Sequence, residues 1–178
     1  VYDRFNSGLP YGYVFDIEFD QAGNIWLANY SGGLVFFDGT DWFAYNTENS
    51  DIPYNHLRTI EIDNNGNKWI GGVSLDTLYG ITKFDGENWT YYNQISSEFP
   101  NGQTANDIAF DEDGQLWSAT GAGLLTFDGF NWTVFNDTNS ALTSKNINCI
   151  TFDDEGTAWI GVSGGLTKFD HINWTAFT

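Results

Sequence analysis

The nine residues FDGTDWFAY (37–45) return as FDGENWTYY (84–92), FDGFNWTVF (127–135) and FDHINWTAF (169–177). In each copy the Trp follows the first Phe by five positions, and an aromatic residue closes the segment. Repeats of about 40–50 residues with strand-like content are typical of propeller blades, in which each unit is a four-stranded sheet. The sequence therefore predicts an all-β protein, a β-propeller of four-stranded antiparallel blades.

Every repeat predicts four strands in the same order. The first strand places two apolar residues two positions apart, as in Ile17 and Phe19, which is the periodicity of one sheet face. An Asp then opens a tight turn with Gly three positions on, and a second strand follows around Trp26. The third strand ends at Phe37, and the FDGxxW turn leads into a fourth strand at Trp42. Because the eight Trp residues recur at fixed positions, they are predicted to pack between neighbouring blades.

The limits of the repeats predict a ring that is not closed. Residues 1–5 (VYDRF) align with DWFAY and predict an additional N-terminal strand of the fourth type, with Phe5 as its closing aromatic residue. The chain would then have five strands of the fourth type but only four of each of the other three types. We therefore hypothesise that it forms half a ring or less and that a second copy or a longer chain completes the ring. The segment 1–178 is predicted to be one domain with repeats at 6–45, 46–92, 93–135 and 136–178.

Composition and charge exclude several classes of function. Six Lys and Arg against 24 Asp and Glu give a net charge of −18, which repels nucleic acid and anionic lipid surfaces. No stretch approaches the roughly 20 apolar residues that span a bilayer, so direct membrane insertion is not expected. The single Cys149 is predicted to pack within a strand. Because the chain begins at VYDRFNSG, without a Met or a signal peptide, we expect a mature or excised segment.

The repeat pattern I-x-x-D-x-x-G-x-x-W-I-G … G-G-L-x-x-F-D-G-x-x-W-x-x-[FY] resembles the two-component regulator propeller repeat of exported proteins in Bacteroidetes-type bacteria. The resemblance covers nearly the whole chain, with two departures: SLDTLYG (74–80) lengthens the second unit, and His171 replaces the Gly of FDG. It implies an exported propeller, located in the periplasm or at the cell surface. It also implies either a sensor module or a surface and secretion-associated protein.

The connections from fourth to first strands and from second to third strands vary in sequence and emerge on one rim. Variable loops on a rigid scaffold are where binding sites usually lie, and Tyr rings with scattered polar groups can stack on sugars or hold a peptide. The candidate ligand-binding residues on this rim are Tyr11, Tyr13, Tyr30, Tyr54, His56, Arg58, Asp76 and Tyr79.

No cofactor, metal site or catalytic residue is predicted. The DNNGN and DEDGQ turns differ from a calcium-binding EF-hand, because they lead directly into a strand instead of a 12-residue loop. His56 and His171 are predicted on opposite rims, which argues against a lyase built on a His pair. A carboxylate pair, Asp16 and Glu18, projects toward the channel where a glycosidase site could form. The equivalent pairs vary, so the repeats offer no symmetric ring of carboxylates: Thr59/Glu61, Asp107/Ala109 and Cys149/Thr151.

The sequence thus favours an extracytoplasmic sensor or receptor module, acting in signalling, that recognises a glycan or peptide through the loop rim. The alternative is a structural surface or secretion-associated protein whose propeller subunits assemble with one another, including a homodimer that closes the ring. A lyase or glycosidase is the least favoured interpretation.

Overall fold

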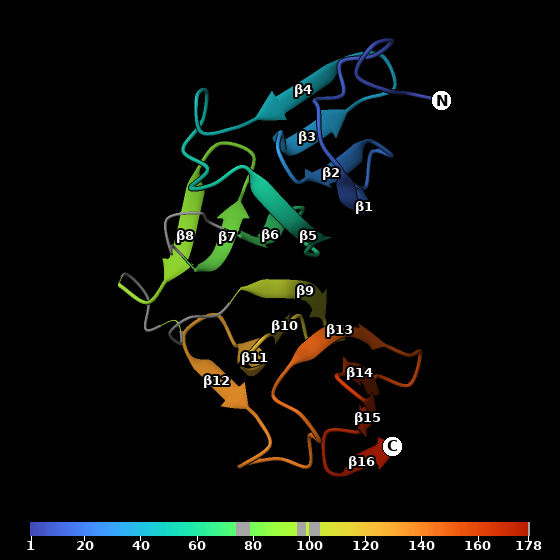
Figure 1. Ribbon diagram of the computed structural model, residues 1–178, viewed down its shortest axis with the longest axis vertical. Coiled ribbons are helices and arrows are strands. Elements are labelled where there is room, and N and C mark those ends of the chain that lie inside the picture. Colours follow the sequence, from blue (N-terminus) through green and yellow to red (C-terminus); the bar gives the residue numbers. More distant parts are fainter. Residues whose placement is uncertain (74–78, 96–98, 100–103, 178) are drawn as a thin grey trace.

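The computed structural model describes residues 1–73, 79–95, 99 and 104–177. Within these residues, sixteen strands form four antiparallel sheets, each taking its strands in sequence order (Figure 1). The predicted four-stranded propeller blades are therefore confirmed. The strands are β1 (Val14–Phe19), β2 (Ile25–Asn29), β3 (Gly33–Phe37) and β4 (Trp42–Tyr45) in blade 1; β5 (His56–Ile62), β6 (Lys68–Val73), β7 (Gly80–Phe84) and β8 (Trp89–Asn93) in blade 2; β9 (Ala105–Phe110), β10 (Leu116–Thr120), β11 (Gly123–Phe127) and β12 (Trp132–Phe135) in blade 3; and β13 (Ile147–Phe152), β14 (Ala158–Val162), β15 (Gly165–Phe169) and β16 (Trp174–Phe177) in blade 4.

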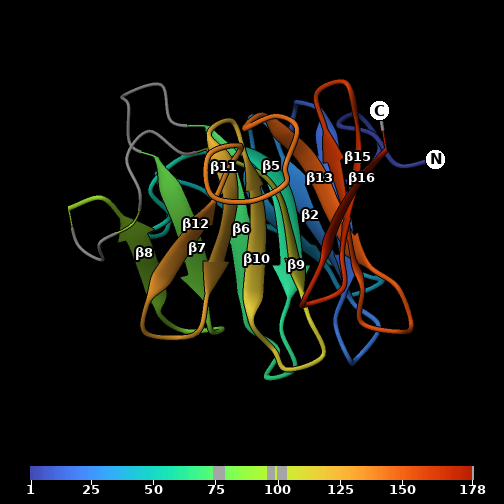
Figure 2. The same ribbon diagram turned by 90° about the horizontal axis from the view of Figure 1, so that it is seen from below.

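The four blades stand in an open arc around a channel. The inner strands β1, β5, β9 and β13 contact one another in that order along the inside of the arc. Both chain ends lie on its open side (Figure 1). The view turned by 90° shows the strands running between two rims (Figure 2). Because each blade is an antiparallel meander, one rim carries the connections between blades and the β2–β3-type loops, and the other carries the tight turns.

An Asp and a Trp fix the first turn of every blade. In blade 1, Asp20 Oδ1 accepts the backbone N–H of Asn24 at 2.9 Å, and Asp20 Oδ2 accepts the indole N–H of Trp26 at 3.0 Å. The same indole bond is made to Asp63, Asp111 and Asp153 at 2.8–2.9 Å. The repeated D-x-x-G-x-x-W motif thus satisfies the polar group of each Trp while its rings stay apolar.

Each blade boundary within the arc has its own apolar core. The core between blades 1 and 2 joins Trp26 and Leu34 of the first blade to Leu57 and Ile60 of the second. Two further clusters join blades 2 and 3, and blades 3 and 4, in the same way. The FDGxxW turn completes the contact, because Tyr45 of blade 1 packs on the stacked Phe and Trp of the next blade. Trp26, Trp69 and Trp117 are only 2–6% exposed, so the prediction of Trp residues packed between blades is confirmed for these three.

The N-terminal segment differs from the predicted additional strand. Residues 1–5 form no strand; Asp3 instead holds a turn by accepting the N–H of Phe5 at 2.7 Å. Phe5 is exposed, and Tyr2 lies on Phe37 and Trp42 with ring centroids 5.4 and 5.5 Å apart. Tyr2 therefore occupies the place that the closing aromatic residue of a preceding blade takes at the other boundaries. The alignment that gave this role to Phe5 was wrong.

Two connections between blades are built alike, although their sequences differ. The N–H of Asn46 donates to the side-chain oxygen of the Asn three positions on at 2.9 Å, and Asn136 repeats this bond at 2.8 Å. At the same position of each connection an apolar residue, Ile52 or Leu142, is buried at 3% exposure. The loop rim therefore contains connections that repeat the same structure as well as variable ones. Fewer of its residues are then available to bind a ligand.

Candidate functional site

A cavity of about 510 Å³ opens at the mouth of the channel on the loop rim, lined by Phe15, Arg58, Asn106, Asn146 and Asn148. Four of these residues occupy one position of the repeat. The pairing of each inner strand with its neighbour skips one residue, and the skipped residues are Phe15, Arg58, Asn106 and Asn148. A β-bulge bends the strand and re-aims the side chain at that position. The fold therefore directs one variable side chain per blade into a common cavity.

Hydrogen bonds fix the polar part of the cavity. Arg58 Nη1 donates to Asn106 Oδ1 at 3.4 Å, and Asn106 Nδ2 donates to the carbonyl oxygen of Ile147 at 2.8 Å. The Arg58 side chain is exposed, and Asn106 is half-buried. The arrangement offers one guanidinium group and several carboxamides, which both donate and accept hydrogen bonds.

A row of aromatic rings extends from this cavity. Tyr13 and Phe15 lie with centroids 6.3 Å apart, Phe15 and Tyr30 5.4 Å, and Tyr30 and His56 4.8 Å. The backbone N–H of Tyr30 donates to the carbonyl of Tyr13 at 2.9 Å, which ties two loops together. Phe15 is 54% exposed and Tyr13 75%, so their ring faces are open to a ligand. The structure thus brings four predicted residues, Tyr13, Tyr30, His56 and Arg58, to one place.

The other predicted site residues lie elsewhere. Tyr54 is 4% exposed and donates its hydroxyl to the carbonyl of Gly80 at 3.2 Å, so its assignment to a binding surface was wrong. The connection that carries it folds inward and makes it part of the core. Tyr11 is exposed under the guanidinium of Arg4, 4.8 Å from its ring centroid. Tyr79 is half-buried just before β7, and Asp76 lies outside the described residues.

Carboxylates line the channel behind the mouth. Asp16 Oδ2 accepts hydrogen bonds from Thr59 Oγ1 at 3.1 Å and from the N–H of Ile60 at 2.9 Å. Burial, reinforced by the charges of Glu18, Asp16 and Asp107, raises the pKa of Glu61 to about 8. Burial also raises the pKa of Glu18 and of Asp107. Within the described part of the chain, no group of three His, Cys, Asp or Glu side chains is arranged to hold a metal ion.

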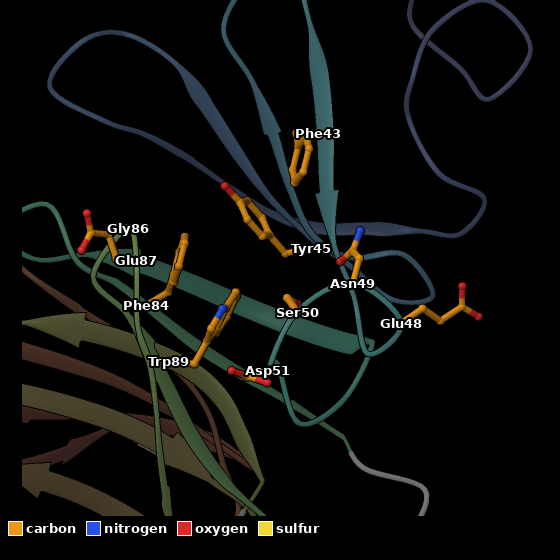
Figure 3. A pocket seen from close by; sticks show the side chains of 10 residues that line it. All are labelled: Phe43, Tyr45, Glu48, Asn49, Ser50, Asp51, Phe84, Gly86, Glu87 and Trp89. Carbon is orange, nitrogen blue, oxygen red and sulfur yellow. The ribbon is translucent and has the colours of Figure 1, made fainter.

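A second cavity, of about 540 Å³, lies on the outside of the arc between blades 1 and 2. Figure 3 shows Tyr45 of blade 1 and Trp89 of blade 2 on its two sides. Its rim carries Phe43 and the carboxylates Glu48, Asp51 and Glu87. The corresponding residues at the boundary of blades 3 and 4 are Thr133, Thr138, Ala141 and Ile172. The residues that line this groove therefore differ from one blade boundary to another, and none of the predicted site residues is among them.

Comparison with known proteins finds structural rather than sequence similarity. No protein-family profile matches the chain, and no curated protein matches it. The extracellular domain of a hybrid two-component system from B. thetaiotaomicron superposes with a TM-score of 0.78 at 25% identity, over 92% of this chain and 23% of that one. PorZ, a surface component of the type-IX secretion system of Porphyromonas gingivalis, gives 0.65 at 21% identity, over 93% and 26%.

A lyase shares the fold as well. Virginiamycin B lyase from Staphylococcus aureus gives a TM-score of 0.72 at 12% identity, over 93% of this chain and 55% of the enzyme. The chain spans about a quarter of the length of that extracellular domain and of PorZ. In the described residues, no helix is long and apolar enough to cross a membrane. The resemblance inferred from the repeat is confirmed at the level of fold: the chain is an open propeller segment similar to the extracellular domains of bacterial two-component systems.

Proposed function

We propose that the chain is an extracytoplasmic recognition module of the sensor or receptor type, which binds a glycan or a peptide at the channel mouth. We place it in an exported protein, in the periplasm or at the cell surface. The observation that carries the proposal is the set of four bulge positions, which bring Phe15, Arg58, Asn106 and Asn148 into one cavity. The rigid blades hold these side chains while their identities vary, which suits recognition.

The chemistry of the mouth favours a ligand with flat apolar faces and many hydrogen-bonding groups. The row from Tyr13 to His56 offers aromatic faces on which sugar rings or peptide side chains can stack. The carboxamides of Asn106 and Asn148 can pair with hydroxyl groups or with peptide N–H and C=O groups. The net charge of −18 and the carboxylates in the channel disfavour a strongly anionic ligand. We therefore expect a neutral or cationic ligand.

Replacing Phe15 by Ala is expected to weaken ligand binding about tenfold, because a stacking ring at the centre of the site is lost. The ligand is first sought with a glycan array and a displayed peptide library. The affinity of the strongest hit is then measured by isothermal titration calorimetry for the parent protein and for Phe15→Ala.

Phe43→Ala is the matched control, since Phe43 is 53% exposed against 54% for Phe15 but lies in the outer groove. It is expected to leave the affinity unchanged. Equal losses in both variants, or a loss in Phe43→Ala alone, would contradict the assignment of the site to the channel mouth.

A structural role in a surface assembly is the second candidate, favoured by the apolar faces that blades 1 and 4 leave open and by the similarity to a secretion component. It predicts that the protein captures no glycan or peptide in these screens while its self-association persists.

We infer no catalytic role. His56 begins β5 on the loop rim, whereas His171 lies at the opposite rim, where its Nε2 contacts the carbonyl of Gly156 at 2.7 Å. The two imidazoles therefore share no site. A measured lyase or glycosidase turnover that is lost in His56→Ala or Glu61→Gln would overturn this inference.

A further inference from the structure

The arc ends in two open faces, a head face on blade 1 and a tail face on blade 4. The head face is formed by Val14, Ile17 and Phe19 of β1. Ile17 is 51% exposed, whereas the Ile at the same position of blades 2, 3 and 4 is 1–5% exposed. Each of those three Ile residues is covered by the preceding blade. The head face therefore has the composition of a blade boundary without its partner.

The tail face carries the complementary half of a boundary. It is formed by Trp159, Leu166 and Phe177 of blade 4. Leu166 is 38% exposed, while its equivalents Leu34, Ile81 and Leu124 are fully buried by the following blade. Trp159 is half-buried, although the other three Trp residues at this position are in the core. The tail face thus presents the side chains that, at the three boundaries within the arc, cover the Ile equivalent to Ile17.

Hydrogen bonding shows which boundary the two faces would reproduce. Asp16 and Asp107 each accept the N–H of the residue after them and the N–H of the equivalent Ile in the next blade, at 2.8–3.0 Å. Blades 2 and 4 carry Thr59 and Cys149 at this position, which have no carboxylate to accept these N–H groups. Thr59 Oγ1 instead donates to Asp107 Oδ1 of blade 3 at 3.4 Å. The N–H of Ile108 in blade 3 therefore donates to Asp107 of its own blade. The N–H of Ile17 in blade 1 donates to Asp16 in the same way. When blade 4 of one copy packs on blade 1 of another, the N–H of Ile17 therefore keeps its acceptor within blade 1. The N–H of Ile108 keeps its acceptor within blade 3 in the same way where blade 2 packs on blade 3.

The sequence has the same two-blade period. Blades 2 and 4 share WIG and TKFD (69–71 and 82–85; 159–161 and 167–170), with Lys83 and Lys168 over their Trp rings at 5.4 and 5.7 Å. Blades 1 and 3 share D-I-x-F-D in their inner strands, and the connections that follow them are the two built alike. A ring that continues this alternation has an even number of blades, and blade 4 is followed in it by a blade of the first type.

We propose that the tail face of one chain packs on the head face of a second copy, so that two copies close an eight-bladed ring around a common channel. Head-to-tail contacts close into a ring when the rotation per subunit fits, and the open arc leaves room for a second arc (Figure 1). The two channel mouths then face one another across a two-fold axis. The inference is independent of the ligand proposed above.

Tyr2 has a defined part in this assembly. It lies on Phe37 and Trp42, where the closing aromatic residue of a preceding blade would lie, so it competes with Phe177 of the partner copy. Closure therefore requires Tyr2 to leave, and Tyr2 is 61% exposed and belongs to no strand. Removing Tyr2 is expected to strengthen self-association, whereas damaging the tail face is expected to weaken it.

The test is the native mass of the 178-residue protein by light scattering and sedimentation, from about 1 to 100 μM and at two salt concentrations, because two chains of charge −18 repel less at high salt. The expected particle has twice the 20.0 kDa of one chain. Leu166→Lys is expected to raise the dimer dissociation constant about tenfold or more, and Tyr2→Ala is expected to lower it. Phe130→Lys, at a 91% exposed turn residue of blade 3 outside both faces, is the control and is expected to change nothing.

Cys149 provides a second measurement that does not depend on mass. It is the single cysteine and is exposed next to the tail face. Its reaction with a thiol reagent is expected to slow as the protein concentration rises, and to stay fast in Leu166→Lys. A monomer at all concentrations with a uniformly reactive thiol would overturn the proposal and favour further blades of the same polypeptide as the natural cover. Particles that grow beyond two chains would overturn the closed ring.

Discussion

Replacing Trp117 by Ala is expected to lower the free energy of unfolding by about 3–5 kcal/mol, the range found when a buried aromatic residue is truncated. Trp117 is 2% exposed and belongs to the core between blades 3 and 4. Its ring stacks on Phe135 and contacts Phe152 of the next blade at a centroid distance of 5.7 Å. Its indole N–H donates to Asp111 at 2.8 Å. The truncation therefore opens a cavity at a blade boundary and removes the indole donor from Asp111 Oδ2.

Two further variants separate these contributions, and urea unfolding followed by circular dichroism measures all three. Trp117→Phe keeps an apolar ring but removes the bond to Asp111, so a smaller loss, of about 1–2 kcal/mol, is expected. Trp159→Ala alters the same position of blade 4, where the next blade is absent, and at low protein concentration it should cost less than Trp117→Ala. A loss below about 1 kcal/mol for Trp117→Ala would contradict the assignment of the Trp residues to the cores between blades.

The repeat allowed the scaffold to be predicted because its contacts are local in sequence or repeat at fixed spacing. The bond from Asp20 to Trp26 spans six residues, and the same motif occurs in every blade. Because the Asp, the turn and the Trp keep the same spacing in all four repeats, the four repeats predict the same local structure. The prediction for residues 1–5 was wrong because one aromatic residue in a short terminal segment can replace another: Tyr2, not Phe5, meets blade 1.

The residues of the candidate site were predicted only in part. Arg58, His56, Tyr13 and Tyr30 were identified as rim residues by their place in the connections. Phe15 was missed because strict alternation along a strand does not reveal a bulge, which depends on pairing with the next strand. The sequence shows only that this position varies among the four repeats, as Phe, Arg, Asn and Asn. Tyr54 was misassigned because a loop that folds inward and one that stays exposed can have the same composition.

Glu61→Gln is expected to stabilise the protein at pH 7 by about 1–2 kcal/mol and to flatten the dependence of stability on pH. Burial in the channel, with the charges of Glu18, Asp16 and Asp107 added, raises the pKa of Glu61 from the ordinary value of 4.5 to about 8. Below pH 4.5 the carboxyl is protonated in both the folded and the unfolded chain. Between pH 4.5 and about 8 the unfolded chain releases the proton while the folded chain keeps it. This contribution to stability is therefore lost as the pH rises through that window.

The measurement is the free energy of unfolding of the parent and Glu61→Gln at several pH values from 4 to 9. The difference between the two proteins should be smallest near pH 4 and should grow up to about pH 8. Glu87→Gln, an exposed residue of the turn before β8, is the charge-matched control and should leave the slope unchanged. Parallel curves for the parent and Glu61→Gln would contradict a protonated Glu61 in the channel.

The repeat itself supports this expectation, since blades 3 and 4 carry the uncharged residues Ala109 and Thr151 at the position of Glu61. The scaffold therefore does not require a carboxyl group there. A group that lowers stability and is not needed for folding is often a functional one. In this fold it lies farther along the channel, three residues after Arg58 on β5, and lines a cavity at the tight-turn rim with Asp63 and Asp113. A protonated carboxyl there can donate a hydrogen bond to a ligand that extends from the mouth through the channel. We expect ligand affinity to fall as the pH rises through the same window in the parent but not in Glu61→Gln. That result would show that the protonated Glu61 side chain takes part in ligand binding.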